Sequence, residues 1–249
     1  RLSTYTASTM GEVGTTAAAT GTVDNPTVKR TGLAVADFAN VFVVGTTDKA
    51  TTPLQLVYYS IADGDWTNAG TWVTDGCGGV DAAASPPPSD AYVKICGTTT
   101  VTIDANSAAA YVDILDGGGL IGTGDFSVSK DFTTAGTGTF APTGGSWVIT
   151  RDVTYAGTGS YTLSGSTTIN GDLNIGSGTT LTMAGGVALA VDGNVTVDGT
   201  LALGTSTATF SGAGKTIDGS AGAASISGAG ATINITDDMS IASTGTLTI

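Results

Sequence analysis

Histidine is absent from the 249 residues, and lysine and arginine together number only eight. Without histidine, the chain lacks the side chain that most often acts as a general base near neutral pH and as a metal ligand. The eight basic residues stand against 21 acidic ones, which gives a net charge of −13. A negative charge of this size repels nucleic-acid phosphates and anionic lipid headgroups. We therefore expect neither nucleic acid nor a membrane surface as a partner.

Long apolar runs are also missing. No stretch of about 18 apolar residues occurs, so we expect no segment that inserts into a bilayer. No signal peptide is visible, and the chain opens on Arg1 rather than Met. We therefore expect a processed or excised piece.

The residues that are abundant favour strands. Hydrophobic residues make up 41 %, charged residues only 12 %, and glycine numbers 38. Long side chains that favour helices are scarce, while Thr, Val, Ile and Gly dominate, which is typical of strands joined by tight turns. The composition therefore predicts an all-β protein with a buried core and almost no helix.

Only two cysteines occur, Cys77 and Cys96. With no third cysteine and no histidine, a zinc site is not expected. A disulfide is the preferred interpretation, with two unpaired buried thiols as the alternative. Closing this loop would stabilise the fold by about 3 kcal/mol in the loop-entropy model. A disulfide would also indicate an oxidising compartment, and so an extracellular or cell-surface location.

A fifteen-residue pattern recurs along the second half of the chain. Its copies are ITRDVTYAGTGSYTL (149–163), INGDLNIGSGTTLTM (169–183), and the related segments 128–142, 191–203 and 235–249. The starts lie 21, 20, 22 and then 44 residues apart, and a degenerate copy near 213–225 accounts for the double interval. A fixed period of this kind is the signature of a solenoid.

Apolar and polar residues alternate within each copy, which is typical of strands with one buried face. The expected inward residues are Ile149, Val153, Tyr155, Tyr161 and Leu163 and their equivalents in the other copies. The fold class predicted is an all-β parallel β-helix with rungs of 20–22 residues and an N-terminal β segment or cap. We expect an N-terminal arm and β segment at 1–59, a cap region with the disulfide at 60–108, and the β-helix at 109–249.

Catalytic groups are sparse within the predicted solenoid. Polysaccharide lyases and hydrolases with this fold need a base beside calcium-binding carboxylates, or paired carboxylates in one groove. Lys130 and Arg151 share one repeat position and each precedes an aspartate, Asp131 or Asp152, so a solvated ion-pair ladder is the preferred interpretation. We expect no enzyme activity, no catalytic or cofactor-binding residues and no cofactor. Turn aspartates Asp192, Asp198 and Asp218 would be the ligands if calcium bound, although ordinary Asx turns are preferred.

Small hydroxyl side chains recur at two outward positions of the pattern and form a candidate binding face. The hydroxyl members of these two files are Thr139, Ser160, Thr162, Thr180, Thr182, Thr200, Thr246 and Thr248. Such files resemble those of ice-binding solenoids. Threonine is also simply a good residue for an exposed strand, and Ala141 and Ala202 interrupt the second file.

The segment SIADGDWTNAGTW (60–72) places two tryptophans around a Gly- and Asn-containing turn, and we expect Trp66 and Trp72 to cap the first rung. This segment, with TTPLQLVYYS before it and PPPSDAYVKI and TTTVTIDAN after it, resembles large secreted surface proteins of Bacteroidota that contain a parallel β-helix. The resemblance implies export, by the type IX route, and a multidomain adhesin or matrix protein. The 249 residues differ from those proteins in one respect, since no C-terminal sorting domain is recognised in them.

The function expected is a structural, non-enzymatic segment of a secreted bacterial surface adhesin, stalk or self-assembling filament. A ligand-binding solenoid for glycan or ice is the alternative, followed by a polysaccharide-degrading enzyme. Surface glycans would require exposed aromatics, whereas the recurring Tyr155 and Tyr161 lie at inward positions. We also expect a candidate assembly edge at Leu247 and Ile249, covered either by further domains of the same chain or, head-to-tail, by the N-terminal arm of another copy.

Overall fold

The computed structural model describes residues 56–236 except 81 and 220–224, and the backbone of short strands elsewhere. It confirms the all-β prediction. The regular elements of the described residues are strands, apart from the 3₁₀ turn η2 (Ala69–Thr71). The chain divides into two compact units, 1–55 and 56–249.

The first unit is a set of short antiparallel strands. Its three-stranded sheet has the order β2 (Thr9–Glu12), β1 (Leu2–Thr6), β7 (Val41–Val44). Two further pairs join β3 (Thr15–Thr16) to β6 (Arg30–Thr31) and β4 (Thr20–Thr22) to β5 (Asn25–Thr27). Strand β7 therefore pairs with β1 within its own unit.

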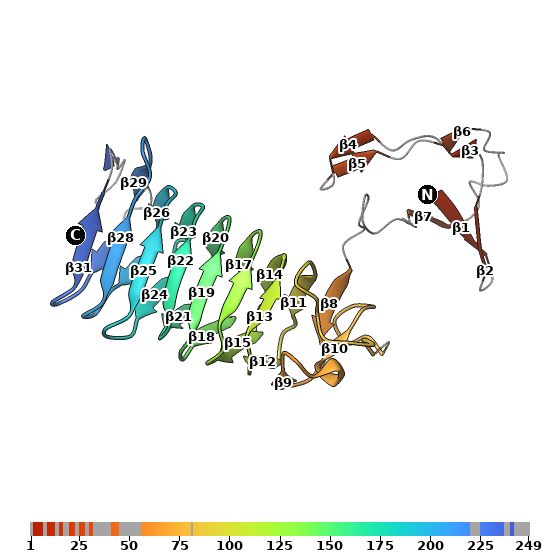
Figure 1. Cartoon of the computed structure of the whole chain (residues 1–249), viewed down its shortest axis with the longest axis horizontal. Helices are drawn as coiled ribbons and strands as arrows, with labels where there is room; N and C mark the ends of the chain where they lie inside the picture. The colour runs from red at the N-terminus through yellow and green to blue at the C-terminus, as the bar shows by residue number, and fades with distance from the viewer. Residues whose placement is uncertain are drawn as a thin grey trace. The chain divides into compact units, whose positions relative to one another are not determined.

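The second unit is a parallel β-solenoid of about six rungs, where a rung is one full circuit through three strands (Figure 1). Face A contains β10 (Trp72–Val73), β8 (Val57–Ser60), β11 (Tyr92–Ile95), β14 (Tyr111–Ile114), β17 (Phe132–Thr134), β20 (Val153–Tyr155), β23 (Leu173–Ile175), β26 (Val195–Val197), β29 (Thr216–Asp218) and β32 (Ser240–Ile241). Of these, only β10 runs antiparallel to its neighbour.

The other two faces are built in the same way. Face B contains β9 (Gly64–Asp65), β12 (Thr100–Ile103), β15 (Gly119–Gly122) and β18 (Thr139–Pro142), and then, as a separate sheet, β21 (Ser160–Leu163), β24 (Thr180–Met183), β27 (Thr200–Ala202) and β30 (Ser225–Ser227). Face C contains β13 (Ser107–Ala109), β16 (Phe126–Val128), β19 (Ser146–Ile149), β22 (Ser166–Ile169), β25 (Ala188–Val191), β28 (Thr207–Phe210) and β31 (Thr232–Ile235).

The register explains the repeat. Val153 lies opposite Leu173, and Leu173 opposite Val195, so the same repeat position stacks on itself from rung to rung. Hydrogen bonds between equivalent positions span 20, 21 or 22 residues, as the period predicts. The double interval before 235 is two rungs, because Val191 pairs with Phe210 and Phe210 with Ile235.

The core is the stack of inward residues. The predicted inward residues each have an exposed fraction of 2 % or less. They are Ile149, Val153, Tyr155, Tyr161 and Leu163. Because each inward side chain lies against its equivalents in the rungs above and below, burial continues along the whole stack rather than around one centre.

The predicted start of the solenoid near residue 109 is too late. Strand β8 already pairs in parallel with β11, and β11 with β14, so the stack begins at Val57. The compact unit likewise begins at 56 rather than 60. The first rungs have inward residues like those of the later rungs. The insertion 74–91 between β10 and β11 interrupts the repeat period there, so the sequence pattern does not reveal these rungs.

Candidate functional site

Trp66 and Trp72 are buried at the N-terminal end of the stack. The two indoles are 2 % and 0 % exposed and meet edge to face, with ring centres 5.1 Å apart. The indole N–H of Trp72 donates to the carbonyl of Trp66 at 2.9 Å, so the ring of Trp72 is buried without an unpaired donor. Trp66 also packs on Phe126, with ring centres 4.9 Å apart. The pair therefore joins the aromatic core of the first rungs.

The N-terminal edge of face A is covered by its own chain. Strand β10 lies antiparallel on β8, and Val73 makes an isolated bridge to Ala82. The N–H of Ala83 donates to the carbonyl of Trp72 at 2.9 Å. An unpaired strand edge recruits other strands, and an antiparallel cover of this kind prevents it.

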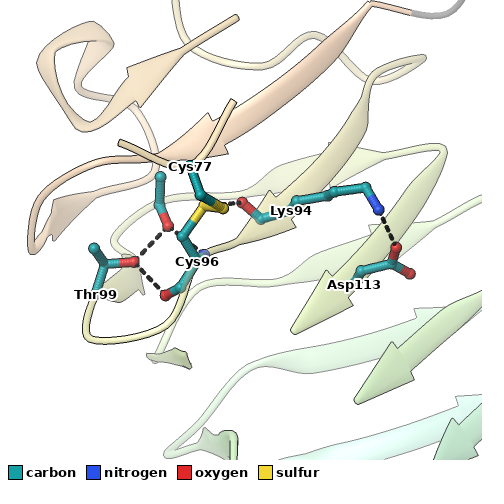
Figure 2. The surroundings of a disulfide bond; sticks show 6 residues. Cys77, Lys94, Cys96, Thr99 and Asp113 are labelled. Atoms are coloured by element: carbon teal, nitrogen blue, oxygen red, sulfur yellow. Dashed lines mark hydrogen bonds and ion pairs between the residues drawn. A yellow bond between two sulfur atoms is a disulfide. The ribbon is translucent and has the colours of Figure 1, made fainter. Parts of the chain in front are cut away.

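Cys77 and Cys96 form a disulfide, with their Cα atoms 5.7 Å apart. The alternative of two free thiols is thereby set aside. Cys96 is 3 % exposed and follows β11 directly, so the bond ties the insertion to the first complete rungs (Figure 2). The surrounding polar atoms are paired, because the Cys96 N–H donates to Ser60 Oγ at 2.8 Å and Thr99 Oγ1 donates to the Cys96 carbonyl at 2.9 Å.

The predicted hydroxyl files lie together on face B. Ser160, Thr180 and Thr200 occupy one column, and Thr162 and Thr182 lie in the next. Thr139 begins the first column on β18, although the sheet is interrupted between β18 and β21. The columns continue into Ser225 and Ser227, which the sequence pattern did not identify. Thr246 and Thr248, like the candidate edge residues Leu247 and Ile249, lie outside the described residues.

A column of polar side chains at the corner between faces C and A binds the backbone of successive rungs, a role that sequence reasoning missed. Each side chain accepts a hydrogen bond from the backbone N–H of the equivalent residue one rung later. The chain of acceptors and donors runs from Asp131 to Asp152, Asp172, Asn194 and Thr216. Arg151 Nε also lies 3.5 Å from Asp131 Oδ1. The expected ion pair is therefore part of a backbone-binding ladder that holds successive rungs together.

A second feature missed by sequence reasoning is an outward group of tyrosines on face A. Tyr59, Tyr92 and Tyr111 come from the consecutive strands β8, β11 and β14, and each is partly exposed. The rings of Tyr92 and Tyr111 lie opposite each other with centres 5.4 Å apart. Each tyrosine occurs at a position that the fifteen-residue repeat does not cover, so no periodic signal marked them.

Charged side chains hold the ring of Tyr92 in place. Its hydroxyl donates to Asp113, and Lys94 Nζ lies 3.0 Å from the same carboxylate and 4.8 Å from the centre of the Tyr92 ring. Partial burial and the neighbouring Asp113 raise the pKa of Tyr92. Burial alone would lower the pKa of Lys94, but the bonds to Asp113 and Tyr92 outweigh it, so the pKa of Lys94 is raised.

An open hollow of about 580 Å³ lies over β13, β16 and β19 on face C. Its lining includes Asn106, Ser107, Ser127 and Ser146, and Asp125 is its one carboxylate among the described residues. That carboxylate accepts the backbone N–H of Ser146 at 2.8 Å. The hollow therefore lacks the second carboxylate that glycoside hydrolysis requires.

The candidate calcium ligands occupy different positions of the rungs. Asp192 accepts a hydrogen bond from the Ser211 hydroxyl, and Asp198 and Asp218 belong to other positions of the rungs. Within the residues that the structure describes, no three Asp, Glu, His or Cys side chains gather as a metal site. Over the same residues, no helix has the length and apolarity needed to cross a membrane.

Comparison with known proteins gives no relative. The chain matches no protein-family model, no curated protein and no solved structure.

Proposed function

We propose that the chain is a structural, non-enzymatic segment of a secreted bacterial surface protein, an adhesin, stalk or filament. The observation that supports this most is the continuous stack of rungs behind an end closed by Trp66, Trp72 and the Cys77–Cys96 bond. Each rung adds about 4.8 Å of length while repeating the same contacts, which suits a protein whose task is to span a distance.

The polar groups favour this function over catalysis. The carboxylates of the corner ladder accept hydrogen bonds from backbone N–H groups of the next rung. Asp152 accepts from Asp172, and Asp172 accepts from Asn194. A catalytic acid or base needs an accessible atom beside the reacting bond. In the described part of the chain, these carboxylates instead satisfy backbone donors at the corners, which is a structural role.

An extracellular location is part of the proposal. The disulfide supports it, because such bonds persist in oxidising compartments. The resemblance of 51–106 to secreted surface proteins of Bacteroidota, exported by the type IX route, supports it independently.

Self-association is proposed to be head-to-tail. The covered edge at β10 disfavours strand addition at the N-terminal end of face A, so a partner would add at the other end. The strands of residues 1–55 supply the candidate arm, and a head-to-tail contact propagates as a filament. Deleting Arg1–Val23 should then convert filaments to monomers in light scattering. Filaments that persist after the deletion, or a full-length chain that is monomeric, would contradict this arrangement, and the latter outcome would favour further domains of the same chain as the cover.

Immunogold labelling of intact source cells tests the function itself. An antibody raised against residues 56–236 should label the surface of unpermeabilised cells, on material that extends from the envelope. A cytoplasmic marker protein serves as the control for intactness. Labelling that requires permeabilisation would refute the proposal.

A further inference from the structure

We propose that the outward tyrosine group on face A is a binding site for a neutral glycan built of β-linked hexopyranose units. The site consists of Tyr59, Tyr92 and Tyr111 with Lys94 and Asp113. This inference goes beyond the structural function, because a stalk can exist without any ligand.

The outward tyrosines lie on the first strands of face A. The column that contains Tyr59, Lys94 and Asp113 continues in later rungs through Thr133, Thr154, Asn174 and Thr196, none of which is aromatic. A partly exposed aromatic ring leaves apolar surface in contact with water. The rings of Tyr92 and Tyr111 lie against each other and Tyr59 lies opposite Lys94, so the tyrosines form a patch around Lys94 rather than scattered residues. Core packing does not explain them, because the inward residues of the same strands, Tyr58, Val93 and Val112, already fill the core.

The patch is held in one geometry before any ligand arrives. The Tyr92 hydroxyl is bound to Asp113, and the Thr133 hydroxyl donates to the other oxygen of that carboxylate at 2.5 Å. Lys94 completes the group at 3.0 Å, and Figure 2 shows this ion pair beside the disulfide at the end of β11. A preorganised ring loses little conformational entropy on binding, which is one of the costs that reduce affinity.

The chemistry of the patch selects the class of ligand. Aromatic faces attract the polarised C–H groups that a pyranose with equatorial substituents presents on its flat sides, and such sites combine apolar rings with a few polar groups that fix orientation. The side chains of Lys94 and Asp113 remain 27 % and 19 % exposed, so an ammonium donor and a carboxylate acceptor lie beside the rings for sugar hydroxyls. The net charge of −13 disfavours uronates and sialylated glycans.

Titration calorimetry of the full chain with cellohexaose tests the site. We expect measurable binding by the wild type and no binding of an oligogalacturonate of the same length. Tyr111→Ala should weaken cellohexaose binding at least about fivefold, since an aromatic contact contributes on the order of 1 kcal/mol. Tyr111→Phe keeps the ring and should bind as the wild type does.

A matched control is available on the same face. Asn174→Ala, three rungs further along, should leave cellohexaose binding unchanged. Circular dichroism of each variant shows whether the β fold is retained, and Tyr92→Phe provides a second ring-preserving variant that removes only the hydroxyl. Absence of cellohexaose binding by the wild type, or equal affinity in Tyr111→Ala, would overturn the glycan proposal. Neither result would affect surface labelling of cells, so the two proposals fail separately.

Discussion

The backbone N–H of Asn194 donates a 2.7 Å hydrogen bond to Oδ1 of Asp172, one rung earlier in the solenoid. The Asn194 side-chain amide also lies 3.2 Å from both carboxylate oxygens. Asp172 in turn donates its own N–H to Asp152 at 2.8 Å. Asp172 therefore connects three rungs at a corner where strand pairing has ended, through its side chain to the next rung and through its backbone N–H to the rung before.

Asp172→Ala should destabilise the fold by about 1–3 kcal/mol, because it leaves the partly buried N–H of Asn194 without its acceptor. Asp172→Asn retains an acceptor oxygen and should lose much less. Urea unfolding followed by circular dichroism measures both. Ser127→Ala, at an exposed position of face C, is the matched control, and equal losses in Asp172→Ala and Ser127→Ala would contradict a structural ladder.

Trp66→Ala should cost about 3–5 kcal/mol, the range for truncating a buried large aromatic residue. The indole is 2 % exposed and contacts both Trp72 and Phe126, so its removal opens a cavity at the end of the stack. Guanidinium unfolding is the measurement. Val80→Ala, at a position 87 % exposed in the insertion, should change the midpoint little. A Trp66→Ala midpoint as high as that of Val80→Ala would show that the end of the stack does not depend on this residue.

Replacing both cysteines with alanine should lower the free energy of unfolding by about 3 kcal/mol, because the bond restricts the unfolded chain across the insertion. The loss should equal that produced by reductant on the wild type, and reductant should have no effect on the double variant. Thermal unfolding with and without reductant measures this. A wild type that is insensitive to reductant would indicate that the disulfide contributes nothing to stability.

Alkaline pH should destabilise the protein through its buried tyrosines. Burial raises the pKa of Tyr155 above its ordinary value of 10.0, with a smaller contribution from Tyr161. A group whose folded-state pKa is raised stabilises the fold fully below the unfolded pKa, and that stabilisation is lost as pH rises through the folded pKa. Stability should therefore be level near neutrality and fall above about pH 10, by roughly 1.4 kcal/mol per pH unit for this group.

Tyr155→Phe removes the titrating hydroxyl. Above about pH 10, the free energy of unfolding of this variant should therefore fall less steeply with pH, by the contribution of one titrating group. Urea midpoints measured between neutral and strongly alkaline pH give the slope for both proteins. Identical slopes would mean that Tyr155 ionises as readily in the folded chain as in the unfolded one.

The repeat was sufficient to predict the rungs, because each inward position, such as Val153 opposite Leu173, must match its neighbour in size and polarity. The cysteine pair was likewise predictable from the absence of other ligands. The start of the stack was not, since the insertion 74–91 separates β10 from β11 and disrupts the period. Hydrogen bonds between rungs, as from Asn194 to Asp172, depend on stacking geometry that a linear pattern does not contain. Tyr92 and Tyr111 each occur outside the repeat, so only the fold brings their rings together.

The proposal of a secreted structural segment is tested most directly by the thiol state of the native protein. Intact source cells are treated with a membrane-permeant alkylating reagent before lysis, and the peptides that contain Cys77 and Cys96 are then identified by mass spectrometry. The account predicts one unalkylated, disulfide-linked pair that separates only on reduction. Two alkylated cysteines in protein taken directly from cells would contradict an oxidising, extracellular location.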